Sequence, residues 1–90
     1  MSKLEKFKDE VSAVNDMLEQ ILDDRTVPKN IRLAAEESIE TLKANEEIEV
    51  KISAIVGLLD EIINDPNMPM YTRTRIWNIV SILEQIREDE

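Results

Sequence analysis

Two stretches of this sequence align without a gap: residues 11–42, VSAVNDMLEQILDDRTVPKNIRLAAEESIETL, and residues 52–83, ISAIVGLLDEIINDPNMPMYTRTRIWNIVSIL. The alignment pairs identical residues 41 positions apart, including Asp24 with Asp65, Pro28 with Pro69 and Arg32 with Arg73. Two amphipathic segments match by chance at apolar positions, but chance does not readily bring an acid, a proline and an arginine into one register. We therefore interpret the chain as one unit repeated, at about residues 4–44 and again at about residues 46–88.

Apolar residues recur every three or four positions in both copies, which is the spacing of amphipathic helices. The first copy carries one stripe from Leu4 to Ile21 and another from Ile31 to Leu42. Proline fits the start of a helix, so Pro28 and Pro69 predict where the second helix of each copy begins. Each apolar stripe must be buried against another helix, and the predicted connections between helices are short. We expect one all-α domain over residues 1–90, an antiparallel up-down four-helix bundle of two tandem helix–turn–helix units that are HEAT-like in construction.

Two motifs resemble the signatures of a known family. The first is VPKNIR at residues 27–32, and the second is DPNMP at residues 65–69 followed by RT at 73–74 and IWNIVS at 76–81. Together they are similar to the archaeal uncharacterised protein family of the UPF class, number 0147, over nearly the whole chain. The resemblance implies a four-helix domain of archaeal origin, and it implies no activity.

The composition removes most catalytic chemistry. The chain has no His, no Cys and a single Gly, so it lacks the usual nucleophile–base pairs, zinc ligands and phosphate-binding loops. The acidic clusters at residues 36–40 and 46–49 contain ligands that suit Mg²⁺ or Ca²⁺, but they are typical of a solvated helix face. We therefore expect no enzyme, no cofactor and no metal site.

The charge balance bears on partners and location. The net charge is −9, which disfavours nucleic acid and anionic membranes. No apolar run is long enough to span a bilayer, and the N-terminal residues lack the apolar core of a signal peptide. We expect a cytoplasmic protein whose partner is another protein or a second copy of itself.

Both predicted turns carry charges at the unfavourable pole of a helix dipole. Asp24 and Asp65 fall near helix C-termini, and the cations that fall near helix N-termini are Lys29, Arg32, Arg73 and Arg75. One interpretation pairs each aspartate with the arginine eight residues later, which would fix the angle of each hairpin. The other gathers these cations at one end of the bundle as a site for phosphate or another anion, with Trp77 stacking nearby.

The second turn differs from the first in being more apolar. Met68, Met70 and Tyr71 either plug the end of the bundle or form a surface for a partner. The leading hypothesis is a non-enzymatic protein-interaction or scaffold module, and the alternative is a small anion- or nucleotide-binding module that uses the arginine-bearing turns. The candidate binding residues are Lys29, Arg32, Met70, Tyr71, Arg73, Arg75 and Trp77.

Overall fold

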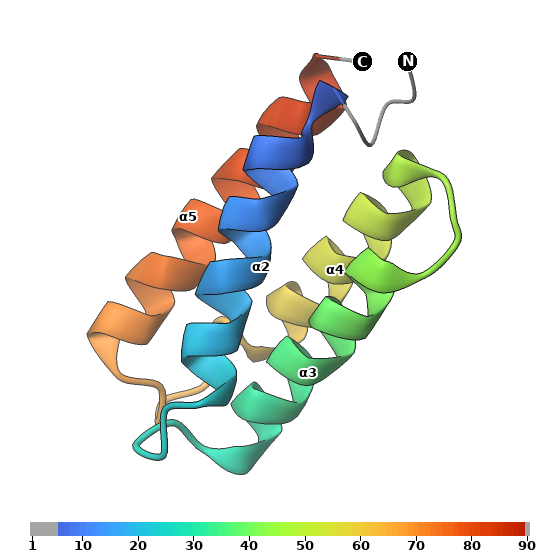
Figure 1. The fold of residues 1–90 in the computed structure, drawn as a ribbon. Helices are drawn as coiled ribbons and strands as arrows, with labels where there is room; N and C mark the ends of the chain where they lie inside the picture. The colour runs from blue at the N-terminus through green and yellow to red at the C-terminus, as the bar shows by residue number, and fades with distance from the viewer. Residues whose placement is uncertain (1–5, 90) are drawn as a thin grey trace.

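The computed structural model describes residues 6–89 and has four helices in this range (Figure 1). They are α2 (Lys8–Leu22), α3 (Lys29–Lys43), α4 (Ile48–Ile62) and α5 (Met70–Glu88). Residues 6–89 contain no strand, and the all-α prediction is confirmed. Leu4, which begins the predicted first stripe, lies outside the described residues.

Consecutive helices run antiparallel, so the α2–α3 turn and the α4–α5 turn lie at one end of the molecule (Figure 1). The start of α2, the end of α5 and the loop between α3 and α4 lie at the other end. We call the first of these the turn end and the second the open end. The molecule is elongated along the helices, with extents of 41 × 20 × 19 Å.

The four helices close into a ring. α2 packs on α3 and α5, and α4 packs on the same two helices. Helices that correspond at the 41-residue offset, α2 with α4 and α3 with α5, therefore lie across the diagonal. A solenoid instead stacks its units side by side along one axis. The helices therefore do not stack as a HEAT-like solenoid would, and their packing is that of an up-down bundle.

The predicted stripes form one aliphatic core. Its fully buried side chains include Val14, Leu18, Ile31, Ile52, Ile55, Ile79 and Leu83. Burying one such side chain contributes about 1.5–3 kcal/mol to folding. A single hairpin would leave one face of each stripe in water, so the two hairpins depend on each other for stability.

The prolines start the second helix of each hairpin as predicted. Pro28 and Pro69 precede the first residues of α3 and α5, and their carbonyls accept the first backbone hydrogen bonds of those helices. Both have φ near the value that the proline ring imposes, −54° and −59°. The chain therefore enters both helices in the same conformation, which places the following side chains equivalently at the turn end.

Candidate functional site

An aspartate organises each helix-joining turn. The backbone N–H of Thr26 donates to Oδ1 of Asp24 at 2.9 Å, and that of Asn67 donates to Oδ1 of Asp65 at 2.8 Å. Aspartate favours turns because its side chain accepts this hydrogen bond from the residue two positions later. The two turns, 41 residues apart, are therefore built by the same local contact.

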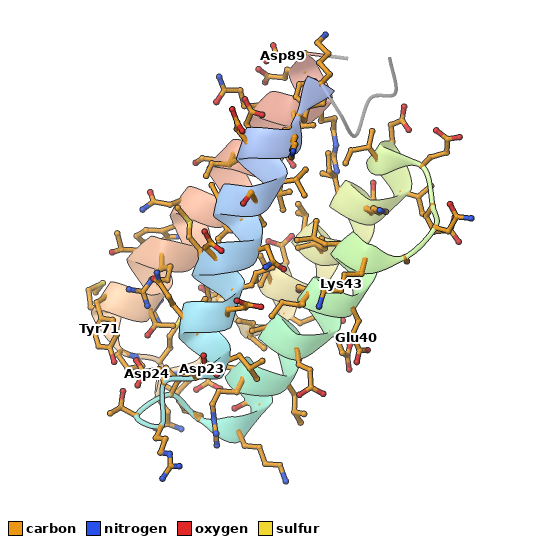
Figure 2. The ribbon with its side chains drawn as sticks, viewed as in Figure 1. Asp23, Asp24, Glu40, Lys43, Tyr71 and Asp89 are labelled. Carbon is orange, nitrogen blue, oxygen red and sulfur yellow. The ribbon has the colours of Figure 1, made fainter. Side chains whose placement is uncertain are left out.

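The remaining oxygen of each aspartate is bound by the other turn. The Tyr71 hydroxyl donates to Oδ2 of Asp24 at 2.6 Å, and the Asn30 side-chain amide donates to Oδ2 of Asp65 at 2.8 Å. Asn30 and Tyr71 are themselves 41 positions apart, so the two contacts are reciprocal. Figure 2 shows Tyr71 and Asp24 meeting at the turn end. The hairpins are thus tied together here by polar contacts as well as by the core.

These hydrogen bonds stabilise the charged form of both carboxylates. Hydrogen bonds from the Thr26 and Tyr71 side chains lower the pKa of Asp24 below its ordinary value of 3.8. The Asn30 side chain and the Asn67 backbone lower the pKa of Asp65 in the same way. Both aspartates therefore hold the turns best when they are ionised.

Within residues 6–89 neither aspartate forms the predicted salt bridge with the arginine of its own turn, although the nearby charge of Arg73 also lowers the pKa of Asp65. Arg32 donates from Nε to the Val27 carbonyl at 3.1 Å, and Arg73 donates from Nε to the Ile63 carbonyl at 2.9 Å. Arg73 also donates from Nη2 to the Asp65 backbone carbonyl at 3.0 Å. Ile63 caps the end of α4, where carbonyls carry partial negative charge, whereas Val27 lies in the turn that leads to Pro28. Arg32 and Arg73 therefore bind backbone carbonyls of the turns that precede their helices.

The candidate binding residues divide into two groups. Lys29 and Arg32 line a small hollow of about 150 Å³ between α2 and α3, which Glu36 also lines. The remaining candidates lie on α5, where the Arg75 guanidinium is 6.0 Å from the centre of the Tyr71 ring. The first group thus lies beside this hollow and the second on α5, and Arg32 and Arg73 each donate to a backbone carbonyl.

The first two turns of α5 present an apolar surface. Met70, Tyr71 and Trp77 are 65%, 50% and 54% exposed, whereas Met68 is 5% exposed. Met70 and Trp77 are seven residues apart, so they lie on the same face of the helix. Tyr71 and Arg75 are four residues apart and lie on the adjoining side of the helix. We call Met70, Tyr71, Arg75 and Trp77 together the α5 face. Of the apolar residues at the second turn, only Met68 plugs the end of the bundle.

Sequence reasoning missed Thr26 and Asn30 as partners of the turn aspartates. The repeat contained a signal for Asn30, because it occupies the position that corresponds to Tyr71. The sequence gave no indication that the two turns touch each other, since those contacts join residues 35 and 47 positions apart.

Between Lys6 and Asp89 no group of three or more His, Cys, Asp or Glu side chains is placed to hold a metal ion. No helix in that range is both long enough and apolar enough to cross a membrane.

The closed ring of four antiparallel helices makes this a small up-down helical bundle protein. The chain belongs to the uncharacterised protein family UPF0147, whose profile matches residues 1–86. A UPF0147 protein of Methanocaldococcus jannaschii is 51% identical over 92% of this chain and 91% of its own. A UPF0147 protein of Pyrococcus abyssi is 43% identical over 97% of this chain and 100% of its own. The family resemblance that the two motifs predicted is confirmed.

Two solved structures share the fold. The crystal structure of the unknown function protein MMP1188 has a TM-score of 0.82 and 45% identity, covering 86% of this chain and 89% of that one. The crystal structure of a UPF0147 protein from Thermoplasma acidophilum has a TM-score of 0.83 and 35% identity, covering 88% and 94%. The four-helix architecture is therefore common to these related chains.

Proposed function

We propose that this protein is a non-enzymatic interaction module that binds a partner protein through the α5 face. The observation that supports this most is the clustering of exposed apolar side chains. Among residues 6–89, five large hydrophobic side chains are exposed, and Met70, Tyr71 and Trp77 account for three of them. Aromatic residues often dominate binding energy at interfaces, and methionine adapts to varied partners.

The α5 face is held rigidly before any partner arrives. Ile76 and Ile79 anchor the other side of the helix in the core, each no more than 1% exposed. The Tyr71 hydroxyl is fixed by Asp24. A surface that is already ordered loses less conformational entropy on binding, which favours affinity.

The charge of the α5 face indicates the chemistry of the partner. No acidic residue occurs between positions 66 and 83, although the whole chain carries 20 acidic residues. Arg75 forms no salt bridge within 4 Å among residues 6–89, although its charge contributes to the lowered pKa of Asp24. The partner that fits is an amphipathic helix with apolar residues on one side and acidic residues beside them.

Two other occupants fit less well. A second copy docked symmetrically would bring the two Arg75 side chains toward each other, which is unfavourable. An anion site at the turns has less support, because Arg32 and Arg73 donate to backbone carbonyls.

The test uses Trp77 as the reporter, since it is the single tryptophan of the chain. The probe is a synthetic helical peptide with leucines on one face and glutamates on the rest, compared with a version that carries lysines in place of the glutamates. We expect the glutamate peptide to shift Trp77 emission to the blue and to saturate. Met70→Asp and Arg75→Glu should each weaken binding about tenfold or more.

The matched control is Val50→Asp, which alters an exposed apolar residue of α4. It should leave binding of the glutamate peptide unchanged. Equal binding of both peptides, or equal loss in the Val50→Asp control, would contradict the proposal. Analytical ultracentrifugation that shows a dimer dissociated by Met70→Asp would instead assign the α5 face to a second copy.

A further inference from the structure

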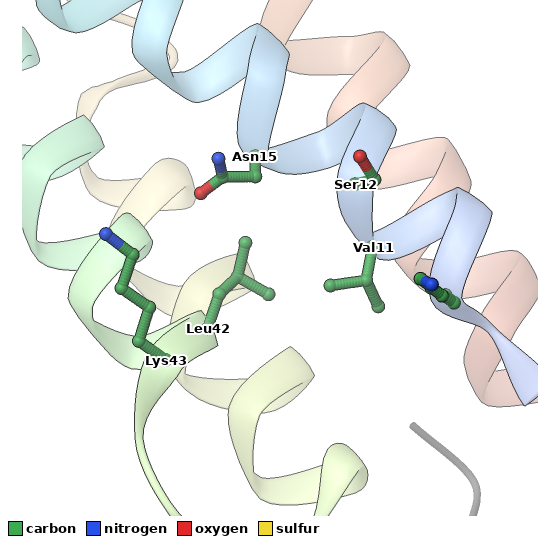
Figure 3. A pocket seen from close by; sticks show the side chains of 6 residues that line it. Val11, Ser12, Asn15, Leu42 and Lys43 are labelled. Carbon is green, nitrogen blue, oxygen red and sulfur yellow. The ribbon is translucent and has the colours of Figure 1, made fainter. Parts of the chain in front are cut away.

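A hollow of about 360 Å³ opens between α2 and α3 toward the open end of the bundle, well away from the turns. It is lined by Lys8, Val11, Ser12, Asn15, Leu42 and Lys43 (Figure 3). The side chains of Val11 and Leu42 face each other across the space. Its volume lies near the lower end of the range of small-molecule pockets, about 300–1,000 Å³.

A comparison with the second copy explains why the first copy contains this hollow. α3 has 15 residues, whereas the corresponding helix α5 has 19. In the additional turn of α5, Arg87 reaches across to the Ser53 hydroxyl at 3.3 Å and also pairs with Glu84 at 3.3 Å. Because α3 ends at Lys43, no such residue spans from α3 to Ser12, the counterpart of Ser53. The hollow is therefore the place where the first copy lacks the side chain that bridges the second.

A polar difference keeps the hollow from closing by apolar packing. Asn15 stands where the second copy has Val56, which packs against the core. Among residues 6–89 the side chains of Ser12 and Asn15 have no hydrogen-bond partner. They leave a hydroxyl and an amide available at a hollow whose other walls include Val11 and Leu42.

Positive charge surrounds the hollow although the protein is acidic overall. Within residues 6–89, Lys8 and Lys43 are the charged residues that line it, and none of the acidic residues of that range does. Lys51, only 3% exposed, donates from Nζ to the Leu42 carbonyl at 2.8 Å. A third ammonium thus lies directly behind one wall. An apolar wall with cations around it suits a ligand that has an apolar body and an anionic head.

We propose that this hollow binds a free amphiphile with a single alkyl chain that ends in a carboxylate. The alkyl chain lies between Val11 and Leu42. The carboxylate meets the Lys8 and Lys43 ammonium groups and accepts hydrogen bonds from Ser12 and Asn15. This site is separate from the α5 face, and its occupancy does not depend on a protein partner.

The experiment titrates the full chain with decanoate while amide resonances are followed by NMR. Residues around the hollow, at positions 8–15 and 42–43, should shift and saturate, and those of the α5 face should not. Decanol, which has the same chain and no charge, should bind about fivefold or more weakly. The melting temperature should rise with decanoate concentration, as expected for a ligand of the native state.

Two variants test the two halves of the ligand. Lys8→Glu combined with Lys43→Glu introduces the residues of the second copy, Glu49 and Glu84, at exposed positions and should weaken decanoate binding about tenfold or more. Val11→Trp fills the space between the helices and should abolish the shifts. Asn15→Val, which also follows the second copy, provides a milder filling variant if Val11→Trp is unstable.

Each part of the proposed ligand site can be contradicted by a separate result. Absence of saturable shifts in the full chain overturns the proposal. Equal binding of decanoate and decanol, or binding that the double lysine variant leaves intact, overturns the proposal that the lysines bind an anionic head group. Shifts that persist in both Val11→Trp and Asn15→Val overturn the location. Association with anionic lipid vesicles without binding of free decanoate overturns the choice of a free amphiphile.

Discussion

At the scale of single residues, Asp24 and Asp65 show how a short-range feature acquires a long-range role. Each accepts a hydrogen bond within its own turn, which the sequence favours by placing Asp at the end of a helix. Each also accepts one from the opposite turn. The local part follows from residue type and spacing. The cross-turn part follows only from the packing of the helices. Reasoning from the sequence therefore paired each aspartate with the arginine of its own turn, which is not the partner of its carboxylate in the structure.

The link between Tyr71 and Asp24 predicts a pH-dependent effect of Tyr71→Phe. Because the pKa of Asp24 is lower in the folded protein, its contribution to stability is present above the ordinary value of 3.8 and is lost as pH falls through the folded pKa. The variant should be less stable than the wild type at pH 7, and the difference should shrink below about pH 4. Urea unfolding at a series of pH values measures it.

A double-mutant cycle with Asp24→Asn is the control for this prediction. If the hydroxyl acts through the Asp24 carboxylate, Tyr71→Phe should have a much smaller effect in the Asp24→Asn background. A stability difference between wild type and Tyr71→Phe that stays constant from neutral to acidic pH would contradict the assignment.

Thr72 is a polar residue in an apolar position. Its side chain is fully buried, and its hydroxyl has no hydrogen-bond partner in the described part of the chain. The corresponding residue of the first copy is Ile31, which is equally buried. Thr72→Val should raise the free energy of unfolding by about 1 kcal/mol, because it removes an unsatisfied hydroxyl at nearly constant volume. Thr72→Ser keeps the hydroxyl and loses a methyl group, so it should destabilise the protein in the same urea assay.

At the scale of helices, the sequence was most informative where one residue type has one structural effect. Proline set the starts of α3 and α5, and the apolar spacing set which faces are buried. The sequence was least informative about how far each helix extends at the open end. The difference in length between α3 and α5 creates the hollow near Leu42, and nothing in the 41-residue pattern marked that site.

Gly57 is an exposed glycine inside α4 whose replacement should stabilise the helix. A methyl group at its Cα would meet no atom within 4 Å, so close packing does not require glycine here. Gly57→Ala should therefore increase the free energy of unfolding by about 1 kcal/mol through helix propensity. Ala54→Gly, at an exposed position of the same helix, should lower it by a similar amount. A loss of stability in Gly57→Ala would show that the glycine serves another role.

At the scale of the whole molecule, the residues that the two copies share differ from those that form the proposed binding surface. Residues shared by the copies, such as Pro28 with Pro69 and Arg32 with Arg73, build the two turns. Residues that differ between them make up the α5 face, where Met70 and Trp77 replace Lys29 and Glu36. The sequence could therefore indicate the second turn and α5 as the surface to examine. It could not indicate that Tyr71 also holds the turns together, because that contact spans both copies.

The closed ring of helices predicts that neither hairpin is stable alone. α2 and α3 bury part of their stripes against each other and the rest against α5 and α4. A peptide of residues 1–46 would expose much of Val14, Leu18 and Ile31 to water, and isolated helices of 15 residues are marginal. Far-ultraviolet circular dichroism should therefore show little helix in this peptide.

Adding a peptide of residues 45–90 should restore the helical signal at equimolar ratio, because the aliphatic core and the reciprocal contacts of Asp24 and Asp65 then re-form. The Asn30→Ala and Tyr71→Phe substitutions remove those contacts from opposite peptides, so each should weaken the reconstituted complex. Leu33→Ala alters an exposed residue and serves as the control. A residue 1–46 peptide that is monomeric and fully helical by itself would refute the dependence of one hairpin on the other.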